Sequence, residues 1–167
     1  MDKVAVYPGS FDPITNGHLD LLERGLKIFD RIVIAIARNP AKKPLFSVEE
    51  RVEMIEKALE AHPLRDRMVV DAFDGLLVEY VKKAGAKAIL RGLRAISDFE
   101  YEFQMALMNR KLSNEIETLY LMTGMRWIYI SSRIIKEVVA SGGCVEGLVH
   151  VHVEKMLAER LRVGQSL

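Results

Sequence analysis

Short apolar runs alternate with longer amphipathic segments along the whole chain. The short runs predict β-strands. The second of them is apolar at successive positions, as in a central parallel strand that is covered on both faces. Strands are expected at residues 3–7, 31–37, 67–72, 87–90 and 117–122.

The longer segments have the periodicity of helices with one buried face. In the first of them, apolar residues recur at three- and four-residue intervals. Ser47 with Glu50, and Ser97 with Glu100, have the spacing of capping boxes, in which two side chains satisfy the amides at a helix start. Helices are expected at residues 17–29, 48–61, 76–84, 98–112, from Ser131 or Ser132 to the pair Gly142-Gly143, and at about 151–162.

This alternation of strands and helices predicts an α/β fold. Parallel strands joined by right-handed helical crossovers give a Rossmann-like, doubly wound, five-stranded sheet with helices on both faces. The length fits one domain over residues 1–167. Ligands of such sheets bind beyond the carboxyl ends of the strands, where the strand order reverses. The residues that follow each strand are therefore the candidates for a site.

The loop after the first strand has the features of a phosphate-binding turn. Gly9 permits a tight turn, and Ser10 offers a hydroxyl group. Gly17 and His18 fall in the first turn of the next helix, where unpaired amides and the helix dipole attract anions. An ordinary turn with an asparagine cap would explain the same residues, so this loop alone does not decide the function.

Basic residues follow two further strands. Lys42 and Lys43 come after the second strand, and Arg91 and Arg94 come after the fourth. Arginine forks suit bidentate phosphate binding. Two alternatives stay open, namely that the lysines are solvated surface charges and that the arginines form structural ion pairs with Asp98, Glu100 or Glu102.

Ser131 and Ser132 follow the fifth strand and precede a helix, which is again typical of an anion site. One serine would suffice as a helix cap, and the nearby Trp127 and Tyr129 could simply pack in the core. Anion-binding groups at four of the five strand ends nevertheless indicate a polyphosphate site. The site uses neither a G-x-G-x-x-G turn nor a G-x-x-x-x-G-K-S/T loop, because the sequence contains neither motif after its first strand.

Composition narrows the class of protein. The 24 Lys and Arg residues nearly balance 23 Asp and Glu, which argues against a general nucleic-acid binder. Cys144 is the single cysteine and can form no internal disulfide, so a reducing cytoplasm is expected. No signal peptide is apparent at the N-terminus, and the longest apolar run, 32–37, is far short of the roughly 20 residues that span a membrane.

Two motifs carry a family resemblance. Thr15-Asn16-Gly17-His18 matches the Thr/His-x-Gly-His signature of a nucleotidyltransferase superfamily, and the run from Arg91-Gly92-Leu93-Arg94 to Asp98-Phe99-Glu100-Tyr101-Glu102 is much narrower. With these motifs, the chain from residue 3 to about 161 resembles bacterial phosphopantetheine adenylyltransferases. The resemblance implies that ATP and 4′-phosphopantetheine react, with Mg²⁺, to give dephospho-coenzyme A and pyrophosphate.

The resemblance also implies roles for individual residues. The catalytic residues would be His18, as a transition-state stabiliser, with Lys42 and Arg91. Phosphopantetheine would contact Ser10, Lys42, Leu77 and Arg91. The ATP site would consist of Ser10, Phe11, His18, Gly92, Leu93, Arg94, Glu102, Trp127, Ile128, Tyr129, Ile130, Ser131, Ser132 and Arg133. A homohexamer and feedback inhibition by coenzyme A are implied in the same way.

The implied chemistry needs no general base, because the attacking phosphate oxygen is already ionised at neutral pH. Catalysis would consist of alignment and of charge stabilisation at the α-phosphate. Arg133 departs from the family pattern, in which a small hydroxyl residue is usual, and His150 stands where proline is common. His150 and His152 are interpreted as surface or interface residues. A related nucleotidyltransferase with another phosphorylated acceptor and a non-catalytic nucleotide sensor are the competing hypotheses.

Overall fold

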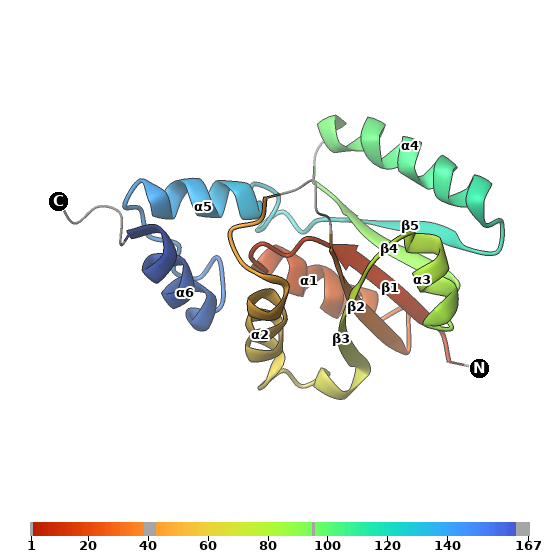
Figure 1. Ribbon diagram of the computed structural model, residues 1–167, viewed down its shortest axis with the longest axis horizontal. Coiled ribbons are helices and arrows are strands. Elements are labelled where there is room, and N and C mark those ends of the chain that lie inside the picture. The colour runs from red at the N-terminus through yellow and green to blue at the C-terminus, as the bar shows by residue number, and fades with distance from the viewer. Residues whose placement is uncertain (1, 39–42, 95, 163–167) are drawn as a thin grey trace.

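The computed structural model describes residues 2–38, 43–94 and 96–162 (Figure 1). Lys42, to which a catalytic and substrate-binding role was assigned, lies outside these residues. The described residues form a parallel sheet in the order β3-β2-β1-β4-β5. Its strands are β1 (Val4–Gly9), β2 (Arg31–Ala37), β3 (Met68–Phe73), β4 (Ala88–Leu93) and β5 (Glu117–Met122). The predicted doubly wound α/β fold is confirmed.

Helices cover both faces of the sheet. The described helices are α1 (Asn16–Gly25), α2 (Val48–Leu59), α3 (Leu77–Lys83), α4 (Ile96–Leu112), α5 (Ser132–Ala140) and α6 (Val151–Arg162), with a short 3₁₀ turn at Arg65–Arg67. Residues of α1, α2, α5 and α6 share one buried cluster, and α3 belongs to the cluster on the opposite face. In Figure 1, α6 lies beside α2 and α5 packs against α6, whereas α4 runs along the β5 edge.

The alternation within β1 explains the two clusters. Ala5 and Tyr7 belong to the first cluster, and Val4 and Val6 belong to the second. All four side chains are at most 7 % exposed, so the strand is buried on both faces. None of the helices in the described ranges is both long enough and apolar enough to cross a bilayer.

The strand order reverses between β1 and β4, and these two strands separate early. They pair only at Ala5 with Ala88 and at Val6 with Ile89, whereas β1 pairs with β2 along its whole length. Pro8 has no N–H group with which to extend a ladder. Beyond this point Nη1 of Arg91 donates a hydrogen bond to the carbonyl of Pro8 at 2.8 Å. A crevice therefore opens at the expected end of the sheet.

Several predicted boundaries were wrong. β4 extends to Leu93 rather than residue 90, so Arg91, Gly92 and Leu93 form the last residues of the strand instead of following it. The helix α4 begins at Ile96, which places the backbone of Ser97 inside its first turn. The first capping box, Ser47 with Glu50, is confirmed.

Candidate active site at the switch point

Two cavities lie at the carboxyl end of the sheet and share one wall. The first cavity has a volume of about 440 Å³, and the second about 610 Å³. The first extends over the start of α1 to the start of α5, and the second lies between α3 and α4. The shared wall consists of Pro8, Gly9, Ser10, Arg91, Tyr101 and Glu102.

The loop between β1 and α1 is held by burial of Phe11. Its side chain is 2 % exposed and makes edge-on contacts with the rings of Tyr7 and His18, at centroid distances of 5.2 Å in each case. The backbone of Phe11 has a φ of 46°, a left-handed conformation that is uncommon outside glycine. Gly9 lies directly beneath the ring, since an added Cβ would be 2.8 Å from Cζ of Phe11. Glycine is therefore required at position 9 for this close approach.

His18 takes part in capping the N-terminus of α1 through one of its two ring nitrogens. The Thr15 N–H donates to Nδ1 of His18 at 3.0 Å, and the Thr15 hydroxyl lies 2.9 Å from the same atom. His18 thus takes the place that Glu or Gln holds in an ordinary capping box. Because Nδ1 accepts, the proton of the neutral ring is on Nε2. This contact gives a physical reason for the spacing of Thr15 and His18.

The charge state of His18 follows from its surroundings. Burial, and to a smaller extent the nearby cations Arg94 and Arg91, together lower the pKa of the His18 ring to about 4. The ring is therefore neutral at pH 7 in the unliganded protein. The positive end of the helix dipole disfavours protonation as well, but the leading cause is burial.

Arg91 is paired within the shared wall. Its Nε donates to Oε2 of Glu102 at 2.9 Å, its Nη2 donates to Oε1 of the same carboxylate, and its Nη1 reaches Pro8. Glu102 is 8 % exposed, and its backbone carbonyl accepts a hydrogen bond from the Tyr120 hydroxyl at 2.6 Å. The ion-pair alternative left open by the sequence is thus realised. The bidentate pair fixes the guanidinium plane of Arg91 between the two cavities.

Arg94 is paired more loosely, at the far side of the first cavity. Its Nε lies 3.2 Å from Oδ2 of Asp98, and its Nη1 donates to the carbonyl of Ile130 at 3.3 Å. The two contacts link the start of α4 to the start of α5. Both predicted arginines therefore border the first cavity together with His18.

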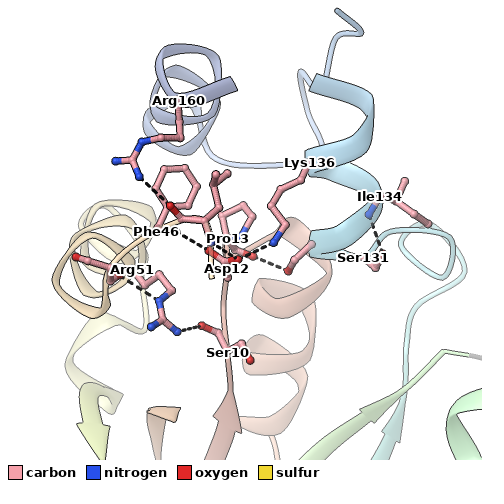
Figure 2. A network of polar contacts seen from close by, with 12 residues as sticks. Ser10, Asp12, Pro13, Phe46, Arg51, Ser131, Ile134, Lys136 and Arg160 are labelled. Carbon is pink, nitrogen blue, oxygen red and sulfur yellow. Dashed lines mark hydrogen bonds and ion pairs between the residues drawn. The ribbon is translucent and has the colours of Figure 1, made fainter. Parts of the chain in front are cut away.

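Asp12 anchors this loop from behind, as Figure 2 shows. The carboxylate is 5 % exposed as a residue and accepts hydrogen bonds from the amides of Leu45 and Phe46 at 3.0 Å each. It also accepts a 2.6 Å contact from Nζ of Lys136 in α5. The buried Arg51 of α2 donates to the carbonyl of Ser10 at 2.7 Å. Three separate segments are thereby tied to the loop.

The structure brings most of the predicted ATP residues to the first cavity: Ser10, Phe11, His18, Gly92, Arg94, Glu102, Trp127, Ile130, Ser131, Ser132 and Arg133. Leu93, Ile128 and Tyr129 line none of the cavities at this end of the described chain, so their contact with ATP stays a prediction. Ser131 caps α5 by accepting from the Ile134 amide, and Ser132 donates to the Pro13 carbonyl at 2.7 Å.

The second cavity has several apolar side chains in its walls. The predicted substrate residues Ser10, Leu77 and Arg91 all line it. Its remaining walls include Phe73, Leu76, Met105, Met108 and Leu112.

Sequence reasoning missed Asp12, Arg51 and Tyr101. Asp12 and Arg51 act through contacts between residues more than thirty positions apart, which no local pattern reveals. Tyr101 stood inside the family motif but was given no role, although it lines both cavities.

The comparisons with known proteins agree with this geometry. Residues 6–138 match the family described as cytidylyltransferase-like, so the chain belongs to this nucleotidyltransferase superfamily. The phosphopantetheine adenylyltransferase of Desulfosudis oleivorans is 56 % identical over 95 % of this chain and 93 % of its own. That of Syntrophus aciditrophicus is 58 % identical over 96 % and 95 %, respectively. The chain belongs to the phosphopantetheine adenylyltransferase family.

A solved structure supports the fold independently. The bifunctional NMN adenylyltransferase/ADP ribose pyrophosphatase of Francisella tularensis superimposes with a TM-score of 0.67 at 18 % identity. The match covers 95 % of this chain and 49 % of that one. At this identity the likeness concerns the fold alone.

Proposed function

We propose that the chain transfers the adenylyl group of ATP to 4′-phosphopantetheine, giving dephospho-coenzyme A and pyrophosphate. The observation that carries this proposal is the wall of Ser10, Arg91 and Glu102 shared by two cavities of different character. One cavity has a helix N-terminus and a neutral histidine, which suit a nucleotide triphosphate. The other has the apolar walls that suit a pantetheine arm.

The reaction is a single in-line displacement. A phosphate oxygen of phosphopantetheine attacks the α-phosphorus of ATP, and a new P–O bond forms. The bond from the α-phosphorus to the oxygen bridging to the β-phosphate breaks, and its electron pair leaves with pyrophosphate. The attacking oxygen is already anionic, so neither a general base nor a covalent enzyme intermediate is needed.

His18 would stabilise charge on the phosphates as a hydrogen-bond donor. With Nδ1 held by Thr15, the N–H group of Nε2 remains for the ligand. A donor fixed before the reaction stabilises the transition state without reorganising. The ring is neutral before the ligand binds. The negative charge of a bound polyphosphate would then raise the pKa of His18.

The acceptor phosphate would lie against Arg91 and Ser10. Glu102 holds one edge of the Arg91 guanidinium through two hydrogen bonds, which fixes the group in the shared wall. Leu77 would contact the pantetheine arm in the second cavity. Lys42 is proposed as a second phosphate ligand from the sequence resemblance alone.

Mg²⁺ would enter as a complex with ATP. Among the described residues, no three His, Cys, Asp or Glu side chains are grouped closely enough to hold a metal ion. The buried carboxylate of Asp12 is already engaged by two amides and Lys136. These residues do not fit a protein-held magnesium site, so the proposed mechanism routes no step through one. Bound to phosphate oxygens, the ion would offset their charge.

Three further properties are proposed with the activity. Coenzyme A carries both an adenylate and a pantetheine portion, so it could occupy both cavities at once and inhibit. The many exposed apolar side chains of α4, such as Phe99, Phe103 and Leu107, favour a homo-oligomer, for which we propose a hexamer. A cytoplasmic location is consistent with the exposed, unpaired Cys144.

The test of the function is pyrophosphate release with three substrate pairs. We expect turnover with ATP and 4′-phosphopantetheine, and little or none with CTP and glycerol phosphate or with ATP and nicotinate mononucleotide. Turnover confined to either of the latter pairs would establish another acceptor. ATP binding without turnover of any pair would instead favour a nucleotide sensor.

A further inference from the structure

The connection between β5 and α5, residues 123–131, forms part of the wall of the first cavity. This β5–α5 loop contributes Thr123, Trp127, Ile130 and Ser131 to that wall. Thr123 and Trp127 are not among the described residues that line the second cavity. A shift of the loop should therefore affect the binding of ATP rather than the binding of the pantetheine arm.

Packing within the β5–α5 loop gives it little support. Met125 is 92 % exposed and Tyr129 is 61 % exposed, so these side chains lie outside the core. The strand that leads into the loop, β5, is the outermost strand of the described sheet and is parallel to β4. The N–H of Thr123 still donates to the carbonyl of Leu93 at 2.9 Å, which extends the pairing with β4 by one residue into the loop.

One side of α1 lies against the loop. Gly17, Asp20 and Arg24 recur at intervals of three and four residues, so they lie on the same side of the helix. An added Cβ on Gly17 would be 3.5 Å from Cβ of Trp127, and one on Gly124 would be 3.2 Å from Oδ2 of Asp20. The loop is therefore in close contact with this side of α1.

Arg24 makes a polar connection between α1 and the end of β5. Its Nη1 donates to the carbonyl oxygen of Met122 at 2.5 Å and lies 3.4 Å from Oδ2 of Asp20. Met122 is the last residue of β5 and directly precedes the loop. Arg24 also falls in the last turn of α1, where the helix dipole stabilises a positive charge. The arginine is therefore held by its own helix while it binds the strand end.

We propose that Arg24, paired with Asp20, is a positioning residue that holds the β5–α5 loop against the helix that carries His18. This role rests on the proposed function. Neither Arg24 nor Asp20 is among the described residues that line the first cavity, so the pair acts on ATP through the loop. It keeps Thr123 and Trp127 in place relative to His18, which fixes the shape of the cavity before the nucleotide binds.

Steady-state kinetics tests the positioning role. Arg24→Ala should raise the KM for ATP about tenfold, the size of one lost charge-assisted hydrogen bond. The KM for 4′-phosphopantetheine and kcat should stay unchanged, because the second cavity and His18 keep their own contacts. Arg24→Lys retains one charged donor and should recover part of the loss.

Arg65→Ala is the matched control. The side chain of Arg65 is 34 % exposed, against 35 % for Arg24, and it also pairs with one carboxylate, that of Glu56. Its Nη1 donates to the carbonyl of Met68 at 2.6 Å. Met68 is the first residue of β3, at the end of the sheet opposite the site. Arg65→Ala should therefore leave the KM for ATP unchanged.

The fluorescence of Trp127 gives a readout that does not depend on turnover, because this is the single tryptophan of the chain. In Arg24→Ala, acrylamide should quench this fluorescence more strongly than in the wild type, since the loop has lost a contact that holds it. Binding of AMP, followed by the same fluorescence, should weaken about tenfold. Arg65→Ala should keep the wild-type quenching and the wild-type affinity for AMP.

Three results would overturn the positioning role: an unchanged KM for ATP in Arg24→Ala, the same rise in Arg65→Ala, or an equal rise in the KM of both substrates. The last would indicate a general loss of structure. If Arg24→Ala weakened AMP binding and increased the quenching of Trp127, but the wild type turned over none of the substrate pairs, the proposed function would fail and the role of Arg24 would stand.

Discussion

The two sides of the site differ in how they are held. The loop that carries Ser10 and Asp12 is held by buried contacts, and Asp12 joins it both to the segment before α2 and to α5. The helix α4, which supplies Glu102 to the same site, carries apolar side chains that are half exposed, such as Phe103 at 50 % and Leu107 at 54 %. The loop side is therefore the more deeply buried of the two.

The two sides of the site have different roles. The loop side must hold donors in place before ATP arrives, because preorganised groups stabilise the transition state most effectively. The α4 side positions Arg91 through Glu102 while much of the helix is without cover in the single chain. A partner chain over α4 would complete this second side. Four predictions, in order of expected size, test the contrast.

Removal of the Asp12 carboxylate should give the largest effect. Asp12→Ala leaves the amides of Leu45 and Phe46 and the Lys136 ammonium without their acceptor, so the free energy of unfolding should fall by about 3–5 kcal/mol. Urea denaturation would measure this. Asp74→Ala removes an exposed carboxylate that lies 3.8 Å from Arg38 and should change stability by less than about 0.5 kcal/mol. Equal effects of the two substitutions would contradict the anchoring role of Asp12.

Removal of the His18 imidazole should have the second-largest effect, and this effect is on the catalytic rate. His18→Ala should lower kcat by about 10²–10³-fold with little change in the KM of either substrate, because the contact is strongest in the transition state. Steady-state kinetics of pyrophosphate release would show this. His62→Ala, which breaks the contacts of that ring with Glu23 and with the Leu64 amide outside the site, is the control and should leave kcat unchanged. A raised KM with unchanged kcat in His18→Ala would argue against transition-state stabilisation.

The sequence predicted the fold and the strand ends because both depend on local periodicity and on rules of parallel sheets. It placed Ser10, His18, Arg91 and Arg94 at one edge, and the structure brings all four to the first cavity. From the sequence, β1 is predicted to end at residue 7, because proline usually ends a strand. In the structure the strand continues through Pro8 to Gly9 alongside β2.

Long-range polar contacts could not be predicted in this way. Asp12 reads as a turn residue in the sequence, and only the folded chain reveals its partners 33, 34 and 124 positions away. The pairing of Arg91 was open for the same reason. Three acidic residues of the following helix were possible partners for the arginines, and the geometry of β4 and α4 selects Glu102 for Arg91 and Asp98 for Arg94.

The pH dependence of stability should report the burial of His18. Its pKa is about 4 in the folded chain, below the ordinary value of 6.5, so the unfolded chain binds the proton more readily. Stability is therefore lost as the pH falls from about 6.5 toward 4. His18→Gln should remove this part of the loss when the two proteins are compared by denaturation at each pH. In NMR spectra the ring should remain the Nε2–H tautomer at pH 6, and a midpoint near 6.5 would contradict the burial of His18.

A charge introduced among the exposed apolar side chains of α4 should have the smallest effect on the folding of one chain. Leu107→Glu exchanges two residues of similar helix propensity at a 54 % exposed position, so helix content should be retained. The mass of the assembly in light scattering should nevertheless fall, because a partner that covers α4 would have to bury the new carboxylate. Ile28→Glu, at a 47 % exposed position outside α4, should leave the mass unchanged. If both variants kept the wild-type mass, the apolar side of α4 would not be the contact between chains, and the contrast between the two sides of the site would need another explanation.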